Sequence, residues 1–362
     1  FEDITIANIF NNRRFMNKIT GYILLSFILL IGCKKYENNK FTTKYIKEEA
    51  VEYSLSPQLL PIDILNPTGI VAIDTFLVFV QQHENKIIKV YSVNDYKILG
   101  NFLRKGNGPN EIVLFTRFNQ FFQQNNESLL WIQSYPNFMG LLNINKSIKN
   151  NNTFFEKKVD FTKSNDMKNI FEESNAVFEL SDSVFLLTKD PIRSQTFKEN
   201  TNPFYVKLNY CSNIVYDTIY INNLKGINFE NNLIYSAYPV IKPNRDKIAL
   251  FYTYMDAIII IDLNTKNKTK IGLSNMGLNT KYAIEQKKQI HYEAFATDSL
   301  LFGLRKDKNN NSVLYTYDWN GVFKYKLYLN ANVLYFSINE KNKTLYGIDE
   351  DDHILAYDLK DI

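Results

Sequence analysis

Short apolar runs separated by polar turns fill the chain from Val51 to Ile362. Runs such as Phe76–Val80, Ile248–Tyr252 and Val333–Ile338 have the length of β-strands, and such runs recur about every 8–12 residues. Asn, Asp, Lys and Ser fill the intervals between them, as is typical of turns. Tyr and Phe, which favour pleated and half-buried surfaces, contribute 24 and 27 residues. The pattern therefore predicts an all-β protein whose strands are joined by short loops.

Helices are expected at two places, Asn165–Glu173 and Asn279–Gln289. Both segments are short, and both stand between groups of strands rather than between single strands. A parallel sheet needs a long crossover after each strand, so sparse helices predict antiparallel sheets.

A longer period organises the strands into groups. The segments Lys247–Leu263, Ser299–Asp318 and Thr344–Leu359 each read as a strand, a turn, and a second strand that closes in an apolar or aromatic residue followed by Asp. Phe76–Ser92 is a looser copy. A period of about 45–55 residues suits four-stranded antiparallel blades, and roughly 310 residues give a six-bladed β-propeller. We expect the Asp residues to cap turns, and a strand near Val51–Leu55 to close the ring by pairing with the last blade.

An apolar segment with a basic start precedes the strands. Lys18 supplies positive charge, and Ile19–Ile31 is too short to cross a bilayer as a stable helix. The segment ends in Leu30-Ile31-Gly32-Cys33, which resembles the lipobox of bacterial lipoproteins, where the Cys is acylated and begins the mature chain. The alternative is a short signal anchor, or an ordinary signal peptide with an incidental Cys.

These features divide the chain into four parts. Residues 1–15 lack an initiator Met and read as a non-native upstream extension, residues 16–32 as a lipoprotein signal peptide, residues 33–44 as a lipidated tether, and residues 45–362 as one propeller domain. Several acyl chains hold a soluble domain stably on a membrane. We therefore expect membrane lipid as a partner through Cys33, a location at the outer membrane of the cell envelope, and a monomer.

Composition narrows the chemistry. Two Cys cannot build a disulfide framework or a Cys-based zinc site, and three scattered His cannot build a metal cluster. The net charge of +4 is spread along the chain, so nucleic acid is not an expected partner. The acidic run Asp349–His353 lacks the EF-hand pattern and predicts a solvated hairpin turn, and Cys211 is expected to be an inert residue of the core or an edge. We expect no metal and no cofactor.

One turn is unusual. Arg104 and Lys105 are followed by Gly106-Asn107-Gly108-Pro109-Asn110-Glu111, which has neither the third Gly of a dinucleotide fingerprint nor the Gly-Lys-Ser/Thr of a phosphate loop. Gly106, Gly108 and Pro109 predict a sharp conformational turn between the first two blades, capped by Glu111. We expect this turn to present Arg104 and Lys105 towards the axis of the ring.

The same turn resembles the Gly-x-Gly-Pro-x-Glu turn of the TolB-like six-bladed propeller lipoproteins of Gram-negative bacteria. Tyr238–Leu263 resembles the fourth blade of that family, Tyr317–Gly321 its fifth and Asn339–Tyr346 its sixth. Ile112 departs from the pattern, because the family often has Phe there. The resemblance implies a lipid-anchored propeller and covers nearly all of the mature chain.

Two classes of function stay open. No nucleophile elbow or zinc-protease motif stands out, which favours a non-catalytic scaffold that binds an envelope protein, peptide or glycan. The alternative is a propeller hydrolase or lyase that acts on a cell-surface polymer. Basic and aromatic residues near predicted strand ends are candidates for a binding site at the mouth of the ring: Arg104, Lys105, Arg117, Tyr252, Tyr254 and Arg305.

Overall fold

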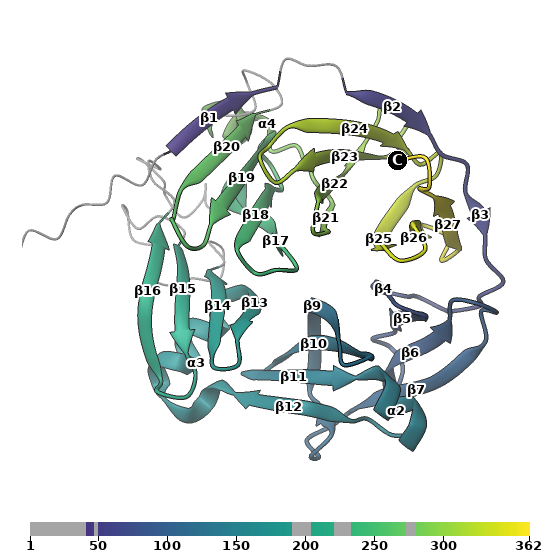
Figure 1. Ribbon diagram of the computed structural model, residues 1–362, viewed down its shortest axis with the longest axis vertical. Helices are drawn as coiled ribbons and strands as arrows, with labels where there is room; N and C mark the ends of the chain where they lie inside the picture. Colours follow the sequence, from purple (N-terminus) through teal and green to yellow (C-terminus); the bar gives the residue numbers. More distant parts are fainter. Residues whose placement is uncertain (1–40, 47–49, 190–203, 221–232, 273–279) are drawn as a thin grey trace, which may run out of the picture. The chain divides into compact units, whose positions relative to one another are not determined.

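The computed structural model describes residues 41–46, 50–189, 204–220, 233–272 and 280–362. Of these residues, 56% lie in strands and 9% in helices. The strands form six sheets arranged as the blades of a β-propeller (Figure 1). The all-β, six-bladed prediction is therefore confirmed. The extension, the signal segment and Cys33 lie outside the described residues.

The first three blades follow one another along the chain, and each begins with its innermost strand. Blade 1 contains β4 (Ile70–Ile73), β5 (Phe76–Val80), β6 (Lys86–Ser92), β7 (Ile98–Lys105) and β8 (Glu111–Ile112). Blade 2 contains β9 (Leu114–Gln124), β10 (Glu127–Tyr135), β11 (Phe138–Asn143) and β12 (Phe155–Asp160). Blade 3 contains β13 (Ser174–Ser181), β14 (Val184–Lys189), β15 (Phe204–Asn209) and β16 (Ile214–Tyr220).

The last three blades each take one further strand from the N-terminal part of the chain. Blade 4 contains β17 (Ala237–Ile241), β18 (Lys247–Tyr252), β19 (Ala257–Asp262), β20 (Lys268–Gly272) and β1 (Phe41–Tyr45). Blade 5 contains β21 (Glu293–Ala296), β22 (Leu300–Lys306), β23 (Ser312–Asp318), β24 (Phe323–Tyr328) and β2 (Val51–Ser54). Blade 6 contains β25 (Val333–Asn339), β26 (Thr344–Asp349), β27 (Ile354–Asp358) and β3 (Gln58–Leu59).

An N-terminal strand closes the ring, as predicted, but it is not the expected strand near Val51–Leu55. Val51–Ser54 pairs in parallel with β24 of blade 5, and β3 is the strand that completes the last blade, antiparallel to β27. β1 pairs in parallel with β20, one blade further back. The reason is the connection into blade 1: the residues just before β4 must lie at the junction of blades 6 and 1, so Val51–Ser54 falls on the preceding blade. The N-terminal run thus covers the outer edges of three successive blades.

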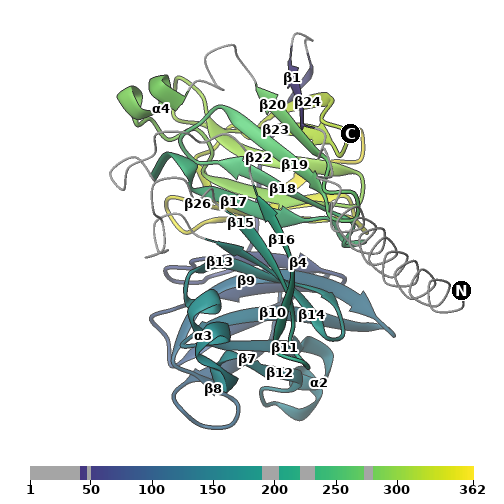
Figure 2. The same ribbon diagram turned by 90° about the vertical axis from the view of Figure 1, so that its left-hand side faces the viewer.

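Helices are confined to connections between strands. α3 (Asn165–Glu172) and α4 (Thr280–Gln286) match the two predicted helical segments as far as the described residues extend, and α3 follows a 3₁₀ turn at Phe161–Lys163. α2 (Ile144–Asn150) was not predicted. Asn143 caps its N-terminus by accepting a hydrogen bond from the Lys146 backbone amide at 2.8 Å. Figure 2 shows α3, α4 and β8 on one side of the ring and α2 on the other.

The core lies between the blades. Each of six clusters of buried apolar side chains joins two successive blades, and the cluster between blades 6 and 1 closes the circle. Strands in the middle of a blade, such as β5, are buried on both faces, which explains why they are continuous apolar runs rather than alternating ones. Among the described residues, no helix is long and apolar enough to cross a membrane.

Candidate functional site

A cavity of about 910 Å³ runs along the axis of the ring. Its walls come from the inner strands β4, β9, β13, β17, β21 and β25, so every blade contributes. These strands lie nearest the centre in Figure 1. We call the side of the ring where they begin the upper face, which carries α3, α4 and β8, and the opposite side the lower face. The volume lies within the range of about 300–1,000 Å³ that is common for small-molecule sites.

Three aromatic rings meet in this cavity. Phe121 of blade 2 lies 5.6 Å, between ring centroids, from Phe295 of blade 5, and Phe295 lies 5.9 Å from Phe336 of blade 6. Blades 2 and 5 are opposite each other in a ring of six, so Phe121 reaches across the axis. We call Phe121, Phe295 and Phe336 the aromatic bridge. It places an apolar surface between the upper and lower ends of the cavity.

Polar side chains from four blades gather at the upper end. The Arg117 guanidinium donates from Nη1 to the side-chain and backbone oxygens of Asn175, both at 3.2 Å. Asn175 in turn donates from Nδ2 to the Ala237 carbonyl at 3.0 Å. Glu293 and Tyr335 complete the wall. We call Arg117, Asn175, Glu293 and Tyr335 the upper cluster.

Burial dominates the electrostatics of the upper cluster. It raises the pKa of the Glu293 carboxyl above its ordinary value, while nearby Arg117 opposes that shift. Burial also raises the pKa of Tyr335, and Glu293 adds to the effect. The neighbouring Tyr238 has a pKa of about 12 for the same reasons, with burial the larger cause. A guanidinium and a carboxyl group thus face one desolvated space together with phenol hydroxyls.

The lower end is more acidic and more open. Lys341 contacts Asp74 at 2.6 Å and lowers the pKa of that carboxyl. Partial burial raises the pKa of Glu340, and Asp298 adds to the shift. Thr297 and the Asp298 backbone amide hydrogen-bond to Glu340 and oppose it. Asp298 and Glu340 are both exposed residues, so this end is a rim rather than a closed site.

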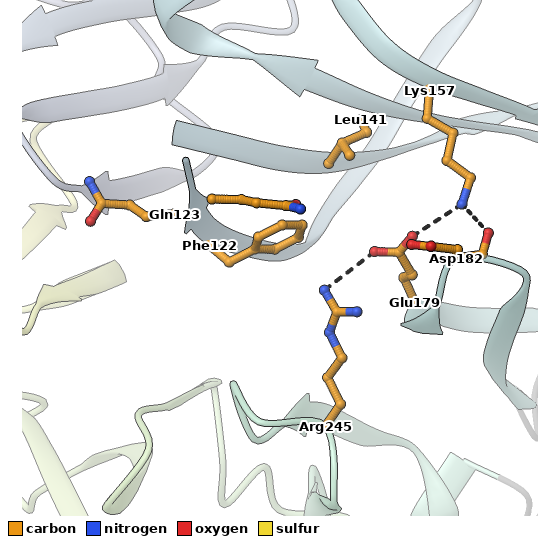
Figure 3. Close-up of a pocket in the computed structure, with 8 residues that line it drawn as sticks. Phe122, Gln123, Leu141, Lys157, Glu179, Asp182 and Arg245 are labelled. Atoms are coloured by element: carbon orange, nitrogen blue, oxygen red, sulfur yellow. Dashed lines mark hydrogen bonds and ion pairs between the residues drawn. The ribbon is translucent and has the colours of Figure 1, made fainter. Parts of the chain in front are cut away.

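A second pocket, of about 500 Å³, lies at the lower ends of blades 2 and 3. The Glu179 carboxylate at its centre pairs with Lys157 at 3.1 Å and Arg245 at 3.4 Å (Figure 3). It also accepts a hydrogen bond from Trp131 Nε1 at 3.2 Å. The Arg245 guanidinium lies 5.1 Å from the centre of the Phe122 ring. The cluster connects blades 2, 3 and 4, and its cations converge on a carboxylate of the protein itself. We interpret it as a structural connection between blades.

The structure separates the six candidate residues of the ring mouth. Arg117 lines the axial cavity. Tyr254 is half-buried near the upper cluster, where it contributes to the raised pKa of Tyr238. Tyr252 lies in the core at 2% exposure rather than at the mouth. Arg305 pairs with Asp256 at 2.8 Å and lies 4.5 Å from the centre of the Tyr315 ring.

Arg104 and Lys105 lie on β7, away from the inner strands. Both are exposed, and Lys105 Nζ donates to the backbone carbonyl of Gln82, a residue at the rim of the cavity. The turn after them does not carry them to the axis. Neither residue lines the axial cavity, and their role in binding remains a prediction.

The turn itself is built around Glu111. The Glu111 carboxylate accepts from the Gly108 backbone amide at 2.9 Å, and the Gly106 amide donates to the Ile112 carbonyl at 3.0 Å. Gly106 has φ of +154°, a region that side chains rarely adopt. Gly108 has no such angle. The obstacle to a side chain there is the Glu111 carboxylate, 2.9 Å from an added Cβ. Of the two glycines, only Gly106 therefore has a backbone angle that calls for glycine.

The acidic run forms the hairpin turn that was predicted. Asp349 Oδ1 accepts from the backbone amides of Asp351 and His353 at 3.0 and 2.9 Å, between β26 and β27. Cys211 is exposed in the turn between β15 and β16, not part of the core. Among the residues that the structure describes, no group of three or more His, Cys, Asp or Glu could hold a metal ion.

Sequence reasoning missed most of the cavity wall. Asn175, Glu293 and Tyr335 occupy early positions of inner strands, and their neighbours in the chain are ordinary strand residues. The signal that could have found them is their place in the repeat: a polar residue near the start of the first strand of a blade points to the axis. Using that signal requires the correct first strand of each blade, which the repeat alone does not give.

No known protein family's profile matches the chain, and no curated protein matches it. Solved structures do. One is a protein of Bacteroides fragilis that is named as exported, at 14% identity and a TM-score of 0.51, covering 88% of this chain and 98% of that one. Another is a DUF4221 family member from Bacteroides vulgatus, at 8% identity and a TM-score of 0.53, covering 84% and 98%. At these identities the similarity shows the fold alone. The chain is a six-bladed β-propeller, and one of the two proteins that share its fold is named as exported.

Proposed function

We propose that this chain is a lipoprotein of the cell envelope, acylated at Cys33 and related to the TolB-like propellers, whose ring binds a ligand in its axial cavity without transforming it. The observation that carries the binding role is the cavity itself. It joins an apolar centre, the aromatic bridge, to a small number of convergent polar groups, the upper cluster. This combination is typical of sites that orient a bound molecule.

The export of such a chain is supported by the lipobox-like Leu30-Ile31-Gly32-Cys33 and by the fold that it shares with a protein named as exported. An envelope scaffold with acyl chains would hold its ring close to the membrane. The ligand is then a molecule present at the envelope.

Binding can be tested by filling the axial cavity with a large side chain. Thr116, a half-buried residue of β9, lines the cavity, whereas Thr162 is exposed outside it. The full chain, Thr116→Trp and Thr162→Trp are incubated with envelope extract, recovered, and their bound compounds identified by mass spectrometry. We expect compounds that are enriched on the wild type and Thr162→Trp but absent from Thr116→Trp. Equal enrichment on Thr116→Trp, or no enrichment at all, contradicts the proposal.

A hydrolase or lyase is the second candidate, and one observation favours it. The carboxyl group of Glu340 has a raised pKa next to Asp298, as a general acid does. That carboxyl also bonds to Thr297 and to the Asp298 amide, which connects blade 6 to a turn of blade 5 and suits a structural role equally well. Turnover of envelope polysaccharide by the full chain that disappears in Glu340→Gln, with folding retained, would establish the enzyme.

A further inference from the structure

Charged side chains of both signs line the axial cavity. At the upper end Arg117 is close enough to Glu293 to oppose the rise of its pKa, and at the lower end Lys341 pairs with Asp74. The two further carboxyl groups at the lower rim, Asp298 and Glu340, leave no surplus of positive charge. A buried ionic ligand group needs an opposite charge that is not already engaged. The cavity therefore disfavours anionic ligands such as phosphates and uronic acids.

The polar groups of the upper cluster are of a mixed kind. Arg117 donates, Glu293 accepts, and the hydroxyl of Tyr335 does both. A ligand hydroxyl also donates and accepts, so a molecule carrying several hydroxyls can satisfy such a set without bringing charge. The hydrogen bonds of Asn175 to Arg117 and Ala237 fix the wall behind these groups, which lowers the entropy that binding must overcome.

Aromatic rings stand beside these polar groups. Phe118 is half-buried, lines the cavity and lies 5.0 Å, between centroids, from Phe115 near the start of β9. Tyr335 and Phe121 also expose part of their rings to the space. The C–H faces of a sugar ring pack on aromatic surfaces, while its hydroxyls point outward to polar groups. Both kinds of surface are present here within one cavity.

We infer that the axial cavity binds a neutral saccharide, with its hydroxyls on Arg117 and Glu293 and a sugar ring against the aromatic side chains above the bridge. The inference rests on the proposed binding function and names its ligand class. The upper cluster makes the polar contacts, and the aromatic bridge limits how far the saccharide enters.

The experiment uses an array of neutral and acidic glycans, probed with the purified full chain. Glu293→Gln keeps the side-chain oxygen that accepts from the Ala294 amide, so it removes charge with little change of shape. Arg117→Gln removes the guanidinium. Exposed residues outside the cavity provide matched controls, Glu84→Gln and Lys308→Gln. Thermal unfolding of each variant verifies that it is folded.

We expect neutral glycans to bind, Glu293→Gln and Arg117→Gln to weaken that binding at least tenfold, and both controls to leave it unchanged. Binding of acidic glycans alone, binding of no glycan, or neutral binding that both cavity variants retain would each overturn the inference. The extract experiment with Thr116→Trp separates the two claims. If the compound that binds the wild type but not Thr116→Trp is not a saccharide, the saccharide inference is wrong and the proposed binding function still holds.

Discussion

At the scale of single residues, much of the polar chemistry serves to hold turns and blades in place. The Asp residues near the ends of the repeated segments cap turns, as predicted. Asp262 Oδ1 accepts from the Thr265 amide at 2.7 Å, and Asp318 Oδ1 accepts from the amides of Asn320 and Val322, both at 2.9 Å. These carboxylates therefore support turns. The groups that face the axial cavity are few by comparison, and they come from different blades.

Removing one of these turn carboxylates should cost stability in proportion to the amides it leaves unpaired. Asp318→Ala removes two hydrogen bonds from the turn between β23 and β24. We expect the free energy of unfolding to fall by about 1–3 kcal/mol in denaturant titrations. Exposed Asp351→Ala is the control and should change it by less than about 0.5 kcal/mol. Equal values for the two variants would show that the Asp318 turn is held by other contacts.

A buried histidine makes stability depend on pH. His291 is fully buried, its Nδ1 lies 2.6 Å from the Tyr252 carbonyl, and burial near Arg305 lowers its pKa to about 3. The unfolded chain protonates this ring below about pH 6.5, whereas the folded chain does not. The free energy of unfolding should therefore fall by up to about 1.4 kcal/mol per pH unit on acidification from pH 6 to 4.

The contribution of His291 is measured as a difference of slopes. Unfolding is followed against pH for the wild type, His291→Gln and the exposed His83→Gln. We expect a shallower slope in His291→Gln and an unchanged slope in His83→Gln. If His291→Gln has the same slope as the wild type, carboxyl groups alone cause the loss of stability at acid pH.

At the scale of elements, the sequence reveals strands more readily than it reveals their partners. Apolar runs mark most strands because strands in the middle of a blade, such as β5 and β19, are buried on both faces. The apolar run Met139–Ile144 has the sequence pattern of a single strand, yet α2 begins at Ile144 because Asn143 caps a helix there. Val51–Ser54 was recognised as a strand and assigned to the wrong blade. Pairing depends on connections across the ring, and a local pattern does not contain them.

The turn between β7 and β8 offers an element-scale test. At Gly106 an added Cβ would collide with the Glu111 carboxylate, on a backbone with φ of +154°. We expect Gly106→Ala to lower the free energy of unfolding by about 1–3 kcal/mol. Gly69→Ala is the matched control, because its Cβ would meet Val80 at an ordinary 3.6 Å. Both variants are compared by denaturant titration, and equal stability of the two would contradict strain at Gly106.

At the scale of the whole molecule, the ring joins residues that the sequence keeps far apart. Phe121 and Phe295 meet across the axis, and Arg117 and Glu293 share one cavity, although the residues of each pair lie 174 and 176 positions apart in the sequence. Arg117 could be nominated from the sequence as a basic residue near a predicted strand end. Glu293 and the aromatic bridge could not, because they become a site only when six blades close. The fold was thus accessible to sequence reasoning, and most of the site was not.

The position of this ring in the cell depends on Cys33. If the lipobox is processed, Cys33 carries the acyl chains, and several such chains hold a protein on a membrane stably. Cys33→Ser should therefore move the chain from the membrane fraction to the soluble fraction of a lipoprotein-competent host. The second thiol provides the control: Cys211 is free and exposed in the propeller, so Cys211→Ser should remain with the membrane.

Labelling with a palmitate analogue should mark the wild type and Cys211→Ser but not Cys33→Ser. A Cys33→Ser protein that stays membrane-bound and labelled would exclude acylation at this residue, and the tethered scaffold with it, while the axial cavity would still bind its ligand.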